Sequence, residues 1–399
     1  MEETKLFNKG FLSITVINFI VYLIYYLLMV IIAVIAKDNL GATTGQAGFA
    51  SGIYIIGTLL ARLFFGKKLE LYGRKQVLRY GILFYLVTTA AYFYIPTIGV
   101  MFAIRFLNGF AYGVVSTACN TIVTAYIPKN KYGQGINYYG LSTSLAAAIG
   151  PFIGMLLLNF SNFYAIIVFS TVMIALTTIA CFAMKIQNIA LNADAIRLAK
   201  KYTLDSFVEY RVLFISFIGF LIGLSYSSVL SFLAAYAKEI NLAEISTFFF
   251  VVYALVVTFT RPASGKIFDK KGENYVLYPS FAFLALGLFV LSFTTSGAML
   301  LISGGLIGLG YGTFMSNGQA VCLKLAPIAR VGVALSTYFI GLDLGLGVGP
   351  YLMGMLQNML SFSGLYQVAG VIPLVCIVLY GIFYHPQPAA ELEMEAESE

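Results

Sequence analysis

The chain has 399 residues, of which 60% are apolar and only 10% are charged. Soluble domains carry about 25% charged residues, so this composition excludes water as the main solvent of the protein. In a soluble chain the formal net charge of +7 would suggest nucleic-acid binding, but the positions of the charges indicate a membrane instead, and no nucleic-acid partner is expected.

Long uncharged segments recur from one end of the chain to the other. A hydrocarbon core about 30 Å thick requires roughly 20 apolar residues per helix, so each segment predicts a transmembrane helix. The expected fold class is an all-α membrane protein with twelve transmembrane helices. They are predicted at residues 11–35, 46–65, 76–96, 98–126, 134–158, 162–184, 210–236, 245–265, 275–295, 297–323, 332–358 and 364–384.

The basic residues alternate from loop to loop. Of the 24 Lys and Arg residues, Lys37 and Lys238 fall on one side, and Arg62, Arg105 and Arg261 fall within or at the edges of spans, so 24 minus these five leaves 19 on the other side. Lys and Arg concentrate in cytoplasmic loops. The pattern predicts a multi-pass protein of the bacterial inner (cytoplasmic) membrane with both termini in the cytoplasm.

A repeat with a constant offset of 199 residues divides the chain. The segment 62–73, RLFFGKKLELYG, recurs as 261–272, RPASGKIFDKKG. The same offset relates Gly109, Gly113, Tyr112 and Gly150-Pro151 to Gly308, Gly312, Tyr311 and Gly349-Pro350. One register over four helices predicts two six-helix halves in the same membrane orientation, which place the substrate near the bilayer midplane between them. The expected division is an N-terminal half at 1–184, a cytoplasmic linker at 185–209, a C-terminal half at 210–384 and an acidic cytoplasmic tail at 385–399.

The loop after the second span carries a recognisable motif. Gly66, Glu70, Gly73, Arg74 and Lys75 resemble the loop 2–3 signature of the major facilitator superfamily, Gly-x-x-x-Asp-x-x-Gly-Arg-Lys, with Glu70 in place of the usual Asp. The second copy consists of Gly265, Asp269 and Gly272.

The resemblance implies a cytoplasmic gate. Each carboxylate would rest against the positive N-terminal end of a facing helix, the eleventh helix for Glu70 and the fifth for Asp269. Opening of the cytoplasmic side would break both contacts. The alternative is a solvated turn whose basic residues, such as Lys67 and Lys68, only enforce topology.

The fourth span carries Arg105, Asn108 and Tyr112 on one helical face. With Gly109 and Gly113 they resemble the helix 4 signature of the same superfamily. An arginine within the membrane is costly and requires a partner or a water-filled cavity. Arg105 is therefore expected to take part in proton coupling, and the alternative is a structural arginine satisfied by backbone carbonyls near the outer end.

The fifth span contains Gly150, Pro151 and Gly154, which resemble the helix 5 signature of exporters in the superfamily. The match is partial, because Ala146 and Met155 replace two of its glycines. Small residues and a proline produce a groove and a bend. The features favour export, but generic close packing is the competing interpretation, because Gly349 and Pro350 recur in the other half.

Asp343, in the eleventh span, alone among the 17 acidic residues lies deep in a predicted span. Burial favours the neutral carboxyl group and a nearby arginine favours the charged one. A site that alternates between these surroundings would bind and release a proton, so Asp343 is the expected proton-coupling residue. The alternative is a protonated packing aspartate between glycines.

Weakly polar side chains occur on the spans that face the cavity in this superfamily, the first, fourth, seventh and tenth. Such a pocket suits a small amphipathic ligand better than a multiply charged one. In addition to Asn108 and Tyr112, the predicted cavity residues are Asn18, Tyr22, Tyr25, Tyr226, Asn317 and Gln319.

The sequence lacks the residue patterns that ATP hydrolysis, metal binding and nucleophilic catalysis require. The chain has no phosphate-binding Gly-x-x-x-x-Gly-Lys-Ser/Thr loop, and its single histidine, His385, lies in the predicted tail. We therefore expect neither an enzyme, a metal site nor a cofactor.

The sequence is interpreted as a monomeric, proton-coupled efflux transporter of small amphipathic molecules in the lipid bilayer, similar to twelve-helix drug:proton antiporters and working by alternating access. The alternatives are a dedicated exporter of a metallophore, peptide or lipid, a proton-coupled nutrient importer, and a membrane receptor or enzyme on a transporter-like scaffold.

Overall fold

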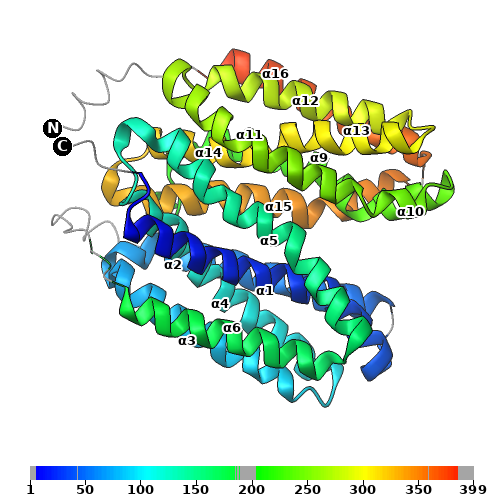
Figure 1. Cartoon of the computed structure of the whole chain (residues 1–399). Coiled ribbons are helices and arrows are strands. Elements are labelled where there is room, and N and C mark those ends of the chain that lie inside the picture. The colour runs from blue at the N-terminus through cyan, green and yellow to red at the C-terminus, as the bar shows by residue number, and fades with distance from the viewer. Residues whose placement is uncertain are drawn as a thin grey trace.

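The computed structural model describes residues 6–42, 44–184, 186, 188, 204–357 and 359–384, and within this part of the chain it contains helices and no strands. The predicted tail at 385–399 and most of the predicted linker, including residues 189–203, lie outside the described residues. Figure 1 shows the long helices lying roughly parallel to one another in two groups.

The first group contains the helices that precede the linker. They are α1 (Lys9–Leu40), α2 (Thr44–Tyr72), α3 (Arg74–Ala90), α4 (Ile98–Thr124), α5 (Tyr132–Phe160) and α6 (Phe163–Ala183), with short 3-10 turns η1 (Ala91–Phe93) and η2 (Lys129–Lys131).

The second group contains the helices that follow the linker. They are α9 (Leu213–Glu239), α11 (Phe249–Lys271), α12 (Asn274–Ser292), α13 (Gly297–Ile307), α14 (Thr313–Leu325), α15 (Val331–Gln357) and α16 (Phe362–Phe383). The π-helical turn η4 (Gly308–Gly312) joins α13 to α14 in one continuous rod, and the short elements are α8 (Leu204–Phe207), η3 (Tyr210–Val212), α10 (Ala243–Ser246) and η5 (Ile328–Arg330).

Nine segments of the described chain are long and apolar enough to cross a membrane, which fits an all-α membrane protein. The three remaining predicted spans correspond to α2, α3 and α5. Helix α3 has only 17 residues, and α2 carries a run of charged residues at its end from Lys67 to Glu70.

The two groups pack in the same way. Helix α1 packs on α5 and α2 on α4 in the first, and their counterparts α9 and α11 pack on α15 and on the α13–η4 rod in the second. Glycines permit the close approach. A Cβ atom at Gly109 would lie 2.1 Å from the carbonyl oxygen of Tyr54, and at Gly308 it would lie 3.0 Å from that of Tyr253. Both pairs obey the 199-residue offset.

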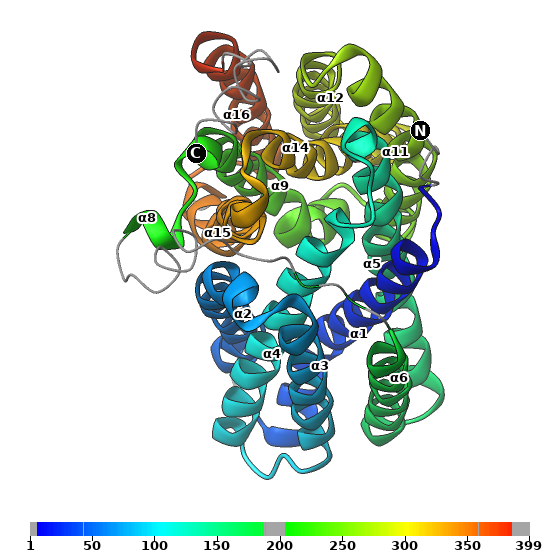
Figure 2. The ribbon, with the colours of Figure 1, turned by 90° about the vertical axis from the view of Figure 1, so that its left-hand side faces the viewer.

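Helix α1 begins and helix α16 ends at the same end of the bundle, which we call the termini side, and we call the opposite end the far side (Figure 1). Gly73 and Gly272 make equivalent turns on the termini side, with φ of 87° and 91°, in the left-handed region that favours glycine. Figure 2 views this side, where α2 lies next to α15 and α5 lies next to α11.

Candidate functional site

An ion pair joins the two halves in the middle of the bundle. The Nε atom of Arg62, on α2, lies 2.9 Å from Oδ2 of Asp343, on α15. Arg62 is ten residues from the end of α2 and Asp343 is twelve residues from the start of α15. At about 1.5 Å per residue, both lie near the middle of a core about 30 Å thick. The pair is therefore buried at membrane depth.

The two side chains of the ion pair differ in how far the protein covers them. The side chain of Arg62 is 3% exposed, and its Cζ atom lies 4.9 Å from the ring centroid of Phe339, one turn before Asp343 on α15. The Asp343 side chain is 21% exposed. The carboxylate therefore has a cationic partner on one side and is not fully covered by protein on the other.

Arg105 does not lie next to Asp343, with which the sequence analysis grouped it. Its Nε donates to the carbonyl oxygen of Ala50 at 2.9 Å, and its Cζ lies 4.4 Å from the ring centroid of Tyr54. These contacts lie within the first half and fit the alternative of a structural arginine near the far side. The charged partner of Asp343 is Arg62 instead, because the two face each other across the α2–α15 contact.

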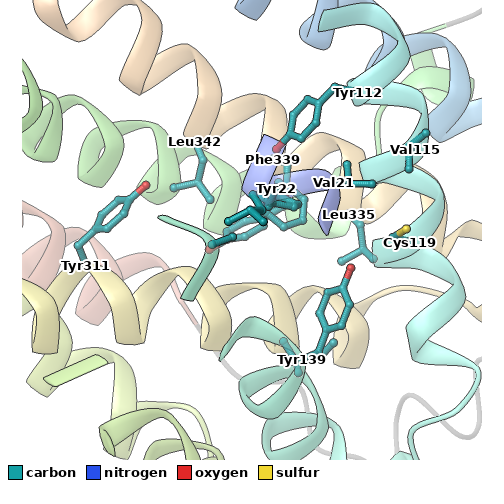
Figure 3. Close-up of a cluster of buried hydrophobic side chains, with 14 of the residues drawn as sticks. Val21, Tyr22, Tyr112, Val115, Cys119, Tyr139, Tyr311, Leu335, Phe339 and Leu342 are labelled. Carbon is teal, nitrogen blue, oxygen red and sulfur yellow. The ribbon is translucent and has the colours of Figure 1, made fainter. Parts of the chain in front are cut away.

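Tyrosine rings from three helices meet in the first half. The Tyr25 and Tyr112 rings stack with centroids 4.8 Å apart, Tyr22 lies 5.3 Å from Tyr112, and Tyr54 lies 5.3 Å from Tyr25. Figure 3 shows Tyr22 and Tyr112 in the buried cluster that includes Phe339 of the other half. The structure thus brings together three of the predicted cavity residues.

A second group of tyrosines lies in the other half. Tyr226 stacks on Tyr311 with ring centroids 3.9 Å apart, and its centroid lies 5.9 Å from that of Tyr253. The 199-residue offset relates Tyr54 and Tyr112 to Tyr253 and Tyr311. Tyr253 and Tyr311 are not among the predicted cavity residues, although the 199-residue offset from Tyr54 and Tyr112 points to both.

The side-chain amides of Asn18 and Asn108 form hydrogen bonds to neighbouring helices within the first half. The Nδ2 atom of Asn18 donates to Ser142 Oγ at 2.9 Å, and that of Asn108 donates to Thr88 Oγ1 at 3.0 Å. Both asparagines are fully buried. They fix α1 on α5 and α4 on α3, so the structure does not place them in a ligand pocket.

Asn317 belongs to a polar contact between the halves. Asn137 Nδ2 donates to Asn317 Oδ1 at 2.9 Å, and Asn317 Nδ2 donates to the carbonyl oxygen of Thr313 at 2.8 Å. Gln319 is 4% exposed, and its Nε2 atom has no hydrogen-bond partner among the described residues.

Asp269 closes the termini side at the junction of α11 and α5. Its Oδ1 accepts from the amide of Gly133 at 2.7 Å and its Oδ2 from the amide of Gln134 at 2.8 Å. Both amides belong to the first turn of α5, where unpaired N–H groups and the helix dipole favour an anion. A Cβ atom at Gly265 would lie 2.7 Å from the carbonyl oxygen of Gly133, so a glycine is needed for this approach.

The first copy of the motif has different contacts. Glu70 accepts from Arg74 Nε at 2.9 and 3.0 Å, and in the described part of the chain the structure gives it no bond to the N-terminus of α15. Gly66 nevertheless packs on α15, because a Cβ atom there would lie 2.1 Å from Ser336 Oγ. The contact expected for Glu70 is therefore replaced by a bidentate pair with the arginine of its own motif.

The glycines of α5 and α15 provide close packing inside each half. Cβ atoms at Gly150 and Gly154 would lie 2.9 and 3.0 Å from carbonyl oxygens of α1, and one at Gly349 would lie 2.0 Å from Ser227 Oγ on α9. Pro350 lies inside α15. Because the same arrangement occurs in both halves, this geometry does not by itself distinguish export from import.

No group of three or more His, Cys, Asp and Glu side chains that could hold a metal ion occurs among the described residues. The four cysteines are free and buried.

The family follows from comparison with known proteins. A sequence model of the Major Facilitator Superfamily matches residues 14–299 and again residues 215–398. The chain belongs to this superfamily. Its family and fold are those of membrane transporters, not of enzymes.

Relatives of this superfamily member include transporters of known and unknown substrates. It is 24% identical to an uncharacterized MFS-type transporter of Methanocaldococcus jannaschii, covering 86% of this chain and 90% of the relative. It is 25% identical to the multi-drug resistance efflux pump PmrA of Streptococcus pneumoniae, covering 78% and 80%. It is 21% identical to the staphylopine export protein of Staphylococcus aureus, covering 89% and 91%.

Solved structures of the superfamily share the fold. A bacterial homologue of the iron transporter ferroportin, in an outward-facing state, matches with a TM-score of 0.76 at 16% identity, covering 94% of this chain and 98% of the other. FucP in an outward conformation matches with a TM-score of 0.75 at 13% identity, covering 96% and 100%.

The described contacts between the halves of this superfamily member gather on the termini side and at mid-depth. They comprise the Asp269–Gly133 and Asn137–Asn317 hydrogen bonds and the Arg62–Asp343 pair. Figure 1 shows the two groups of helices diverging toward the far side. The structure is therefore closed on the termini side.

Proposed function

We propose that this transporter exports small amphipathic molecules in exchange for protons, with Asp343 as the proton-binding residue and Arg62 as its switching partner. The observation that carries the proposal is the ion pair of 2.9 Å between the halves at membrane depth. Ionisable residues inside a membrane mark ion or substrate pathways by default, and this acid lies at the contact between the two moving parts.

The ion pair gives the proton a mechanical effect. An ionised Asp343 holds α15 against the cation of α2. A proton from the far side neutralises the carboxylate, leaves Arg62 without its anion and weakens the contact between the halves. Breaking a buried pair costs roughly 3–5 kcal/mol, which is enough to shift a two-state equilibrium more than a hundredfold. Opening of the termini side then releases the proton there.

Alternating access also requires the second contact to open. The hydrogen bonds from Gly133 and Gln134 to Asp269 hold α11 on the first turn of α5. Each charge-assisted hydrogen bond contributes roughly 1.5–3 kcal/mol. Asp269 therefore works as a latch that must release whenever the halves rock apart.

The driving force is sufficient for export. A potential of about 100 mV supplies roughly 2.3 kcal/mol per charge, and a difference of about one pH unit adds roughly 1.4 kcal/mol. One proton could then sustain about a 500-fold gradient of a neutral substrate.

Two kinds of evidence support export of amphipathic molecules. Tyrosine rings of both halves flank the ion pair and offer apolar faces with polar edges, which suit such ligands. Relatives at 21–25% identity are named as multidrug efflux pumps and as a staphylopine exporter. The second name favours export of one dedicated metallophore-like metabolite as the alternative within the same mechanism.

We further propose that the termini side faces the cytoplasm of a bacterial cell and that the transporter works as a monomer. Basic residues such as Lys68, Arg74, Lys266 and Lys270 lie on that side, as expected for cytoplasmic loops. Maleimide labelling of single cysteines introduced at Lys270 and at Glu244 in intact cells tests the orientation, and labelling of position 270 from outside would overturn it.

The test is proton movement in proteoliposomes with an imposed pH gradient. Wild type, Asp343→Asn and Arg62→Gln are compared over a panel of amphipathic dyes, antibiotics and peptides. Glu244→Gln, an exposed position of α10, is the matched control for loss of a carboxylate. We expect at least one compound to dissipate the gradient with wild type and the control only. Equal proton flux with Asp343→Asn would remove Asp343 from the mechanism, and substrate flux without protons would exclude antiport.

A further inference from the structure

Arg261 is a buried cation that forms no ion pair with any described residue. It lies on α11, ten residues from the termini-side end, and is 2% exposed. Its Nε and Nη1 atoms have no hydrogen-bond partner among the described residues. The two other arginines at membrane depth are both engaged, Arg62 with Asp343 and Arg105 with the carbonyl oxygen of Ala50.

The internal repeat shows what Arg261 lacks. The 199-residue offset maps Arg62 to Arg261 and maps Phe339 and Asp343 on α15 to Gly140 and Ser144 on α5. Arg62 lies against position 339 and pairs with position 343. Correspondingly, a Cβ atom at Gly140 would lie 2.1 Å from Nη1 of Arg261. The contact at the counterpart of Phe339 is therefore reproduced, and the same offset assigns Ser144 to the position of the acid.

The side chains around Arg261 are polar and aromatic instead of acidic. Ser316 Oγ lies 2.8 Å from the same Cβ position at Gly140, and the hydroxyl groups of Tyr253 and Tyr26 lie within electrostatic range of the guanidinium. Both tyrosines are half-buried, in contrast to Arg261 itself.

The charge at membrane depth is also unbalanced. Among the described residues, Arg62, Arg105 and Arg261 lie within the spans and Asp343 is the one carboxylate deep in a span, so three cations and one anion leave a net charge of +2. An uncompensated charge inside a membrane protein is costly. Ionisable residues inside the membrane mark ion or substrate pathways.

We infer that Arg261 binds the carboxylate of an amphipathic, anionic substrate, with Tyr26 and Tyr253 against the apolar part of the molecule. A guanidinium binds a carboxylate through charge-assisted hydrogen bonds, and the Nε and Nη1 atoms of Arg261 are donors with no partner among the described residues. Because Gly140 has no side chain, Nη1 of Arg261 can lie directly against the backbone of α5. This inference rests on the proposed function, because it names the class of molecule that the same central site would export.

The charge of the substrate has a consequence for the driving force. Inward movement of one proton and outward movement of one monoanion transfer two charges across the membrane in each cycle. The membrane potential then acts on both, whereas export of a neutral molecule uses it once.

The experiment uses matched pairs of carboxylates and their amides, for example salicylate with salicylamide and octanoate with octanamide. The purified full-length protein in detergent is heated with each compound, and the ligand-induced shift in Tm is measured relative to the same protein without ligand. Four proteins are compared: wild type, Arg261→Gln, Arg261→Lys and Ser144→Asp. The last supplies Arg261 with the acid that the other half possesses.

We expect at least one carboxylate, but not its amide, to stabilise wild type. Apparent affinity should fall at least tenfold in Arg261→Gln and in Ser144→Asp and should be partly retained in Arg261→Lys. Because each variant is its own reference, a change in its basal Tm does not obscure the result. Equal shifts with acids and amides, equal shifts in wild type and Arg261→Gln, or no shift with any carboxylate would overturn the inference.

Different results would exclude the anion site at Arg261 and the proton coupling through Asp343. Proton-coupled transport of only neutral or cationic compounds, unchanged in Arg261→Gln, would leave the proposed antiport intact and exclude the anion site. Binding of carboxylates through Arg261 without proton movement in proteoliposomes would establish the anion site and exclude the coupling through Asp343.

Discussion

The carboxylate of Asp269 accepts hydrogen bonds from the first turn of α5, of which the bond from Gly133 measures 2.7 Å. Its counterpart Glu70, 199 residues earlier, is directed to Arg74 of its own motif instead. The two copies of one motif therefore have different roles in this molecule. One joins the halves and the other fixes a turn within its own half.

This difference predicts an asymmetry between two isosteric substitutions. Asp269→Asn replaces one accepting oxygen by a donor opposite backbone N–H groups, so we expect the closed termini side to lose about 1–3 kcal/mol. Glu70→Gln should change the closure by less than about 1 kcal/mol, because its partner lies in the same half. Spin labels placed in pairs on the α5 and α11 ends report the open fraction. An equal increase in both variants would contradict the assigned roles.

The Arg62–Asp343 pair predicts non-additive effects on stability. Arg62→Gln and Asp343→Asn each leave one buried charge unpaired, and each should destabilise the protein by roughly 3–5 kcal/mol. The double variant removes both charges and should recover most of the loss. The four buried free cysteines allow a thiol-reactive dye to follow thermal unfolding. Additive losses in the double variant would show that the two charges do not interact.

The internal repeat made part of this site predictable from the sequence. The Asp269 contact with the fifth helix was expected because a motif with a fixed offset, together with its family, specifies which helices face each other. The separation of Asp343 from other acids was also visible, since its span contains no second charge. The charged partner of Asp343 was not predictable in this way. Three arginines lie at or within spans, and the sequence pattern does not show which of their helices faces α15.

The asparagines show a second limit. Asn18, Asn108 and Asn317 lie on spans that face the cavity in the superfamily, so the resemblance made them expected cavity residues. In the structure each amide bonds a neighbouring helix, because a buried polar group must find a partner. Helical periodicity gives the face of a residue but not whether the next helix supplies such a partner. The contact expected between Glu70 and the eleventh helix is absent from the described structure for a similar reason. Arg74, four residues away across the Gly73 turn, supplies the hydrogen bonds to Glu70 instead.

Glu273 predicts a stability change at acid pH. Burial would raise its pKa, but the hydrogen bond from Lys324 at 2.9 Å outweighs this, and the pKa of Glu273 lies below its usual value of 4.5. A group with a lowered pKa in the folded state stabilises above its unfolded pKa and loses this contribution as the pH falls through the folded pKa. The Glu273–Lys324 pair should contribute less than about 1 kcal/mol to the free energy of unfolding, because Lys324 is 41% exposed.

The measurement for Glu273 is thermal unfolding between about pH 3 and pH 7. Wild type should lose stability relative to Glu273→Gln below about pH 4.5, and the two should differ most near neutral pH. Glu244→Gln, at the exposed carboxylate of α10, serves as the control and should parallel wild type. A constant difference between wild type and Glu273→Gln over the whole range would show that the carboxylate contributes through packing instead of charge.

Gly109 and Gly308 provide a matched pair for the packing of the two halves. Each contacts a carbonyl oxygen of an equivalent tyrosine, but a Cβ atom would lie 2.1 Å from it at Gly109 and 3.0 Å at Gly308. The shorter distance is to backbone and cannot be relieved by a side-chain rotation, so α2 and α4 must separate. We expect Gly109→Ala to cost about 1–3 kcal/mol and Gly308→Ala distinctly less. The midpoint of thermal unfolding measures both, and an equal or larger loss at Gly308 would mean that the α11–α13 contact is the tighter one.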